Sequence, residues 1–231
     1  MIYITGDTHR YFDRVEDICS TVDSTTDDVI IILGDAGINY YGDYAGASDW
    51  ELKRELSELP ITLFCIHGNH EMRPESIDTY ETIEWNGGLV YSEEEFPNLL
   101  FAKDGEIYDI NGRRAVVIGG ANSIDKFMRI RGQDWWPDEQ PSDEIKNYVE
   151  NQLEKIGWEV DIVLSHTCPY KYLPRHVFLP FVDEEAVDNS TEEWLDLIED
   201  KLKYDIWFCG HFHTDESFGR ICFMWNDVTY L

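Results

Sequence analysis

Residues 204–213, YDIWFCGHFH, join a short apolar run to a glycine and two histidines that stand two positions apart. An apolar run of this length is typical of a strand that is covered on both faces. The two histidines have two possible explanations. They are either solvated loop residues or ligands of a metal site, and in the second case further ligands must stand elsewhere in the chain.

Apolar runs of the same kind recur along the sequence, separated by amphipathic segments. The runs predict strands over residues 2–5, 29–33, 61–66, 115–118, 161–165, 205–209 and 220–225. Helical spacing of apolar residues predicts helices near residues 12–19, 50–59, 142–156 and 190–202. Ser142 is the expected N-cap of the third helix, and Ser190 with Glu193 forms a capping-box pattern at the start of the fourth. This alternation predicts an α/β fold.

The composition describes a folded chain that fits one domain over residues 1–231. Hydrophobic residues make up 43% of it, and no apolar stretch is long enough to span a membrane. The N-terminal residues lack the pattern of a secretory signal. Three of the five scattered cysteines lie in or beside apolar runs, which suits buried free thiols. We therefore expect a cytoplasmic protein with no membrane contact.

The formal net charge of −29 bears on the possible partners. A surface this acidic repels phosphate backbones, so non-specific nucleic-acid binding is not expected. An enzyme for anionic substrates needs local positive charge, which bound divalent cations would supply.

Polar residues follow five of the predicted strands, where ligands bind in open α/β sheets. The five motifs are GDTH at 6–9, GDAG at 34–37, GNHE at 68–71, SH at 165–166 and GHFH at 210–213. A lone aspartate after a glycine is usually a turn residue, and a lone histidine is usually a hydrogen-bonded core residue. Five such motifs, each at the end of a strand, instead predict one site assembled from the whole chain.

This ordered series resembles the calcineurin-like metallophosphoesterase family, whose pattern is D-x-H, G-D-x-x-D, G-N-H-[DE], an isolated His and G-H-x-H. The resemblance implies a four-layer α/β/β/α sandwich with two divalent metal ions. It implies the following ligands: Asp7, His9 and His213 for the first metal, Asn69, His166 and His211 for the second, and Asp35 bridging the two.

The residue types agree with such a centre. Carboxylates, imidazoles and an amide carbonyl without a thiolate favour Mn²⁺, with Fe, Zn²⁺ and Ni²⁺ as alternatives. Two ions on one carboxylate would lie about 3.5–4 Å apart and make a bridging hydroxide available as the nucleophile near neutral pH. By the same resemblance, His70 donates a proton to the leaving oxygen. The alternative for His70 is a structural histidine outside the metal shell.

The chain departs from the family pattern at two positions. Ile38 stands where the second aspartate of G-D-x-x-D is expected, and no arginine follows it. In the serine/threonine phosphatases of the family, that aspartate supports the histidine and the arginine grips phosphate. Arg10 follows the D-x-H motif where glycine is common, and it either grips phosphate or forms a surface salt bridge.

Two further segments are candidates for the substrate pocket. Residues 120–137, GANSIDKFMRIRGQDWWP, contain Arg129 and Arg131 beside two tryptophans. One explanation is that the segment forms a loop over the site and binds substrate. The other is that its two tryptophans belong to a core or an interface. Residues 168–181 follow His166 and are the second candidate wall.

Together these features predict a metal-dependent hydrolase of phosphate esters. We expect a phosphomonoesterase that acts on a small phosphorylated substrate or a phosphopeptide. The alternatives are a phosphodiesterase acting on nucleotides or nucleic-acid ends and an inactive metal-binding scaffold.

Overall fold

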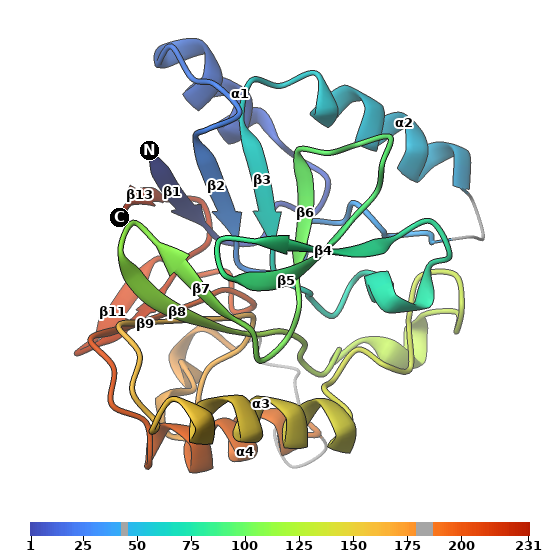
Figure 1. Ribbon diagram of the computed structural model, residues 1–231. Helices are drawn as coiled ribbons and strands as arrows, with labels where there is room; N and C mark the ends of the chain where they lie inside the picture. The colour runs from blue at the N-terminus through green and yellow to red at the C-terminus, as the bar shows by residue number, and fades with distance from the viewer. Residues whose placement is uncertain (43–45, 179–186) are drawn as a thin grey trace.

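A computed structural model of the chain describes residues 1–42, 46–178 and 187–231. Two β-sheets form its centre, and two helices cover the outer face of each (Figure 1). The helices α1 (Asp13–Thr21) and α2 (Gly46–Ser57) cover the first sheet, and α3 (Asp143–Lys155) and α4 (Ser190–Glu199) cover the second. The predicted four-layer α/β/β/α sandwich is confirmed.

The two sheets are mixed and have parallel strands at their centres. The first runs from edge to edge through β13 (Val228–Tyr230), β1 (Ile2–Thr5), β2 (Val29–Ile32), β3 (Thr62–Cys65), β6 (Leu99–Ala102), β5 (Gly88–Ser92) and β4 (Glu81–Trp85). The second runs through β11 (Glu216–Phe218), β12 (Ile221–Phe223), β10 (Ile206–Cys209), β9 (Ile162–Ser165), β8 (Arg113–Ile118) and β7 (Ile107–Ile110). β1, β2, β3 and β6 are parallel in the first sheet, as are β8, β9, β10 and β12 in the second.

Three apolar clusters fill the three interfaces between the four layers. Alternate residues of each central strand belong to different clusters. In β2, Ile31 packs in the cluster between the sheets, whereas Ile30 and Ile32 pack toward α1 and α2. In β10, Phe208 lies between the sheets and Trp207 faces α3 and α4. This two-sided burial explains why the strands are apolar throughout.

All four predicted helices are found, and their ends differ from the predicted ones by up to four residues. Ser142 caps α3 as predicted, since its Oγ accepts a hydrogen bond from the backbone N–H of Ile145 at 3.3 Å. The predicted capping box at α4 is wrong, because Ser190 is already inside the helix and its hydroxyl donates to Gln140 Oε1 at 3.3 Å. α2 and α4 also end before residues 59 and 202, which the apolar spacing had included.

The registers bring the polar motifs to one edge of the sandwich. Thr5 of β1 pairs with Ile32 of β2, which pairs with Cys65 of β3. In the second sheet, Ser165 of β9 pairs with Cys209 of β10. The loops that leave these strands therefore start side by side. In the part of the chain that the structure describes, no helix is long and apolar enough to cross a membrane.

Candidate metal centre

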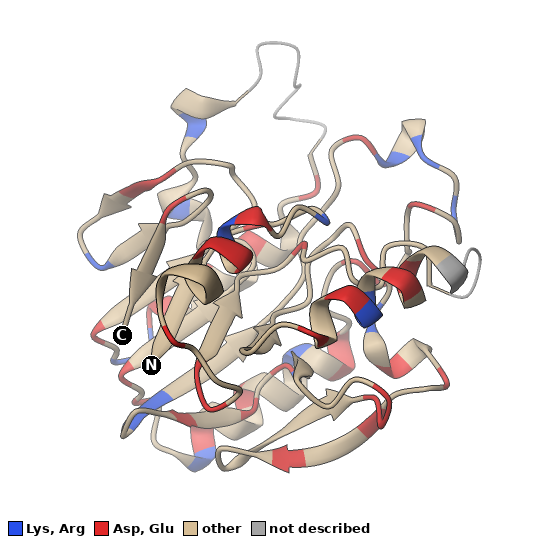
Figure 2. Cartoon of the chain, turned by 90° about the horizontal axis from the view of Figure 1, so that it is seen from above, with Lys and Arg blue, Asp and Glu red and all other residues tan. Residues whose placement is uncertain are grey.

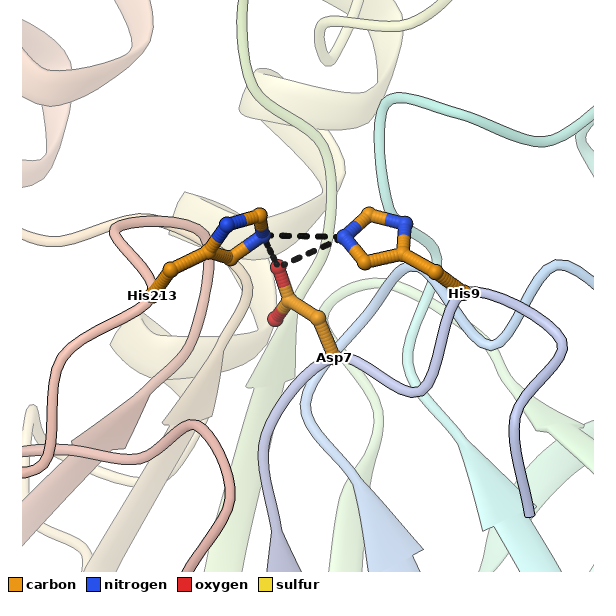
Figure 3. Close-up of side chains that lie close together, drawn as sticks. All are labelled: Asp7, His9 and His213. Carbon is orange, nitrogen blue, oxygen red and sulfur yellow. Dashed lines mark hydrogen bonds and ion pairs between the residues drawn. The ribbon is translucent and has the colours of Figure 1, made fainter. Parts of the chain in front are cut away.

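The loops after β1 and β10 bring Asp7, His9 and His213 together. The ligand atoms of these three side chains lie within 4.8 Å of one another. Asp7 Oδ2 is 3.3 Å from His213 Nε2 and 3.7 Å from His9 Nε2, and the two imidazole nitrogens are 2.9 Å apart (Figure 3). The three residues predicted for the first metal therefore converge on one point.

A second group lies deeper, at the ends of β2, β3 and β9. Ligand atoms of Asp7, Asp35 and His166 also lie within 4.8 Å of one another. Asp35 Oδ2 is 3.6 Å from His166 Nε2, which is 2.8 Å from Asn69 Oδ1. Asp7 is thus common to both groups in this arrangement, and the bridging role of Asp35 stays a prediction.

The two histidines of GHFH lie in different groups, as the resemblance implies. The ring of His213 stands beside His9 in the first group, with centroids 5.0 Å apart. The ring of His211 stands beside His166 in the second group, also with centroids 5.0 Å apart. The backbone N–H of His211 donates to Asp7 Oδ1 at 3.0 Å, which ties the loop after β10 to the loop after β1.

The loops that carry these side chains adopt strained backbone conformations. Among the described residues, eight that are not glycine have positive φ, and five of them belong to this region: His9, Arg10, Asp35, His211 and His213. A conformation of this kind costs about 1–3 kcal/mol per residue and persists only where the surroundings enforce it. Such clustering is typical of functional sites.

The glycines of the motifs make room for the ligands. A Cβ on Gly68 would lie 2.0 Å from Asp35 Oδ1, and one on Gly210 would lie 2.3 Å from Asp7 Oδ1. A Cβ on Gly34 would lie 2.0 Å from His166 Nδ1. Only Gly34 also has a positive φ, of +96°. The backbone conformation at Gly34 therefore favours glycine, whereas Gly68 and Gly210 are required for space.

Burial and neighbouring rings set the charges of His211 and Asp35. Burial, followed by the nearby His166 ring, lowers the pKa of His211 to about 3, so its imidazole is neutral and has a free lone pair. Burial raises the pKa of Asp35, but the rings of His166, His70 and His9 together lower it below its usual value. An ionised carboxylate and neutral imidazoles are the forms that bind metal.

The donor set fits divalent cations. His166 Nδ1 lies 2.8 Å from the Leu33 carbonyl and must donate to it, which leaves Nε2, 2.8 Å from Asn69 Oδ1, as the nitrogen that faces the site. A ring that binds metal through Nε2 presents its lone pair there, beside the Asn69 oxygen. Asp7 Oδ2 is buried and accepts no well-aligned hydrogen bond from any described residue. Cations bound to these atoms would satisfy all of them.

Two residues near the motifs have structural roles that the sequence did not settle. Arg10 donates to Asp49 Oδ1 at 2.6 Å and to the Gly37 carbonyl at 2.8 Å, so the salt-bridge explanation is favoured over a phosphate grip. Glu71 is fully buried and accepts from the backbone N–H groups of Gly37 and Gly68. Burial and the charge of Asp35 raise the pKa of Glu71 to about 8.

A pocket of about 890 Å³ opens over both ligand groups and includes the side chain of His70. Residues 122–129 and 170–178 both contribute to its lining, and residues 179–181 of the second candidate segment lie outside the described part of the chain. Arg129 lines the pocket, whereas Arg131 is exposed and does not. Neither tryptophan of 120–137 lines it. Trp136 is buried, as the core explanation expects.

Two residues of the 120–137 loop that the sequence did not single out contact this centre. Ser123 Oγ accepts a hydrogen bond from Asn69 Nδ2 at 2.8 Å and so fixes the orientation of that amide. Asp125 lines the pocket beside Arg129. Neither residue belongs to a motif, and the fold brings them here through an irregular loop, so no sequence pattern could have found them.

Two clusters of carboxylates and imidazoles at the strand ends of a two-sheet sandwich define an α/β protein built to bind divalent metal. The sequence matches the family model of the calcineurin-like phosphoesterases over residues 1–215, and the chain therefore belongs to that family. It is a metal-dependent phosphoester hydrolase, and the family implies a dinuclear centre. No curated protein matches the sequence. One protein of known crystal structure is 14% identical in sequence to this chain. The two structures align over 96% of this chain and 88% of the other chain, with a TM-score of 0.47.

Proposed function

We propose that the protein is a phosphomonoesterase for a small phosphorylated molecule or a phosphopeptide. The observation that carries the proposal is the pocket of about 890 Å³ over the two ligand groups. A monoester places its phosphate on the metals and leaves one organic group for the pocket. Aromatic and apolar side chains, among them Tyr40, Met128 and Phe178, are suited to such a group.

The surface charge supports a small substrate over a polynucleotide. Acidic residues occur on helices and loops throughout the view of Figure 2, and basic residues are few. The net charge of −29 repels a phosphate backbone at long range. A small phosphate carries fewer charges, and the cations of the centre offset them locally.

We propose that Asp7, His9 and His213 hold one cation, that Asn69, His166 and His211 hold the other, and that Asp35 bridges them. When bound, the cations supply Lewis acidity that lowers the pKa of a water molecule and neutralises charge on the phosphoryl oxygens. Mn²⁺ is the proposed ion, because the donors are carboxylate, imidazole and amide oxygen, without thiolate.

His70 is the proposed proton donor. Its side chain is 18% exposed and lines the pocket, and its Nε2 lies 4.0 Å from Asp35 Oδ2. A histidine at this place can give its Nε2 proton to the leaving oxygen, a step for which general acids contribute about 10²–10⁴-fold.

All five cysteines are free, which supports the proposed cytoplasmic location.

The test compares p-nitrophenyl phosphate with bis(p-nitrophenyl) phosphate, using Mn²⁺-loaded protein and the Asp35→Asn variant as the blank. Faster turnover of the monoester that disappears in the variant supports the proposal. Preference for the diester would contradict it and direct the search to nucleotides and nucleic-acid ends. Two bound ions without turnover of either ester would favour a metal-binding scaffold.

A further inference from the structure

Two phenylalanine rings form part of the pocket wall beside the deeper ligand group. Phe212 stands between His211 and His213 in the GHFH motif, and its ring lies against the ring of His211, with centroids 4.9 Å apart. Phe178 is stacked on Phe212, with an interplanar angle of 17° and centroids 6.1 Å apart. Both phenylalanines line the pocket. An aromatic surface therefore begins at a proposed metal ligand and continues to Phe178.

The core of the second sheet fixes the position of Phe212. Its ring packs edge-on against Phe223 of β12, with centroids 5.8 Å apart and an interplanar angle of 73°. Phe223 is buried in the apolar cluster between this sheet and the helices α3 and α4. A ring that packs against a buried core residue and against His211 has little freedom to turn. Phe212 is therefore a rigid part of the pocket wall.

Two tyrosines add aromatic surface to the same pocket, and the protein also holds them in place. The rings of Tyr40 and Tyr41 meet edge to face, with centroids 4.9 Å apart. The buried carboxylate of Asp49 accepts from the backbone N–H of Tyr41 at 2.9 Å, and the guanidinium of Arg10 lies 5.3 Å from the centroid of the Tyr41 ring. Arg129 donates to the hydroxyl of Tyr40 at 3.3 Å. These contacts order both rings before a substrate binds.

Fixed aromatic rings favour a flat aromatic partner over an aliphatic one of similar size. An aromatic pair in offset or edge-to-face contact binds about two- to tenfold more tightly than its buried area alone would give. Because the rings of this pocket are already ordered, a substrate loses little of that gain to the ordering of side chains. The lining thus favours a substrate that carries an aromatic ring.

The place of Phe212 also limits the length of the substrate. Its ring adjoins His211, so the part of the substrate that contacts it must lie close to the phosphate. A ring attached to the ester oxygen directly, or through one carbon, can reach this surface. The base of a nucleotide is separated from its phosphate by a ribose and would lie farther away.

We propose that the substrate is a phosphate monoester whose organic group is an aromatic ring, attached to the ester oxygen directly or through one carbon. Phe178 and Phe212 form the subsite for that ring. This inference rests on the proposed function, in which the phosphate lies on the cations. A small aryl phosphate and a phosphotyrosine side chain share this chemistry, and the kinetic test distinguishes them.

The first test measures binding and needs no turnover. Isothermal titration calorimetry of the Mn²⁺-loaded protein compares benzylphosphonate with cyclohexylmethylphosphonate, which have the same phosphonate group and rings of similar size. The wild type should bind the benzyl compound about three- to tenfold more tightly. Equal affinities, tighter binding of the cyclohexyl compound, or no binding of either would overturn the proposal.

Three variants show whether the phenylalanine pair causes the preference. Phe178→Leu and Phe212→Leu each keep an apolar side chain but remove the ring, and each should lower the preference below twofold. Phe218→Leu is the matched control, because Phe218 also packs on Phe223, with centroids 5.9 Å apart, but is not among the described residues that line the pocket. It should keep the wild-type preference. A preference that persists in a folded Phe178→Leu or Phe212→Leu variant, or is lost in Phe218→Leu, would overturn the assignment; thermal melts show which variants are folded.

Kinetics then identify the source of the ring. Phe178→Leu should lower kcat/KM about two- to tenfold for both phenyl phosphate and a phosphotyrosine peptide. In the wild type, a higher kcat/KM for the peptide would identify a protein substrate, and a higher value for phenyl phosphate would identify a small aryl ester. A higher value for adenosine 5′-monophosphate than for either would overturn the proposed length of the substrate.

The proposed function and the aromatic subsite can fail separately. If the wild type hydrolyses no phosphate monoester but prefers benzylphosphonate, the proposed function fails and the subsite stands. If it hydrolyses monoesters but binds the two phosphonates equally, the proposed function stands and the subsite is wrong.

Discussion

The two ligand groups use the same residue types but differ in how the protein holds them. The deeper group is almost closed to solvent: Asp35 and Asn69 are 1% exposed and His166 is 0% exposed. In the outer group, the side chains of His9 and His213 are 31% and 46% exposed. One ligand group is therefore built into the core, and the other lies at its surface.

The hydrogen bonds differ in the same way. His166 is fixed through Nδ1 by the Leu33 carbonyl, and Asn69 is fixed through Nδ2 by Ser123. The imidazoles of His9 and His213 instead meet each other and the carboxylate of Asp7. The inner group is therefore held by hydrogen bonds from the protein, whereas the outer group has none to its imidazoles from described residues outside the group. Under the proposed function, we expect the outer group to gain its order from the bound ion.

The largest expected effect is the loss of the carboxylate that is proposed to bridge the two cations. Asp35→Asn should lower phosphatase activity about 10³-fold or more, because an amide neither bridges two cations nor neutralises them. The amide oxygen can still accept from the backbone N–H of His70, so the fold should persist. Activity assays, metal analysis and a thermal melt check this. Activity within tenfold of the wild type would contradict the proposed bridge.

A methyl group placed against the inner group should cost stability. In Gly34→Ala the new Cβ would meet the fully buried His166 ring at 2.0 Å, and the residue would have to keep a φ of +96°. We expect a loss of about 3 kcal/mol in the free energy of unfolding, measured with urea. Gly219→Ala is a matched control, since Gly219 has a φ of +62° and open space around it. Equal losses would mean that backbone strain alone, and not His166, sets the cost.

A substitution in the outer group should raise the Mn²⁺ concentration that the enzyme needs for activity. Loss of an outer-shell partner of a metal ligand costs about 10–100-fold in affinity, and loss of His213 itself should cost at least as much. His213→Asn should therefore need at least tenfold more Mn²⁺ for half-maximal activity and recover part of its rate at high Mn²⁺. A metal titration of activity measures this. An unchanged requirement would show that His213 is not a ligand.

Much of this centre could be predicted from the sequence, because each proposed ligand lies within four residues of the end of an apolar strand. The strands over 2–5, 29–33 and 205–209 needed only their apolar character, and the parallel registers then brought the motifs together. Ser123 and Asp125 could not be predicted, since they come from an irregular loop whose path depends on tertiary contacts. The capping box at Ser190 failed because Asn189 is the N-cap of α4 and Ser190 is already the first residue of the helix.

Metal removal should lower stability without unfolding the protein. The inner ligands keep their hydrogen bonds to Leu33 and Ser123, so the chain should stay folded in a chelator. One site at 100 times its Kd adds about 2.7 kcal/mol, which is about 5–10 °C in the midpoint for a chain of this size. Differential scanning calorimetry with and without Mn²⁺ checks the shift. In His213→Asn the shift should be smaller, and complete unfolding in the chelator would contradict a preorganised inner group.

The smallest expected effect is at Arg131, which is exposed and lies outside the pocket lining. Arg131→Gln should change KM for an aryl phosphate by less than twofold. Arg129→Gln should change turnover more, because Arg129 lines the pocket and holds Asp125. Steady-state kinetics on both variants shows which of the two arginines contributes to substrate binding, since the sequence made both of them candidates. A large effect at Arg131 would extend the pocket beyond its described lining.

The central claim is that one chain holds two cations in an inner and an outer position. The most direct measurement is anomalous diffraction at the manganese edge from crystals of the Mn²⁺-loaded protein. We predict two peaks on either side of Asp35, one beside His9 and His213 and one beside His166 and His211. A single peak, or peaks away from these side chains, would contradict the account.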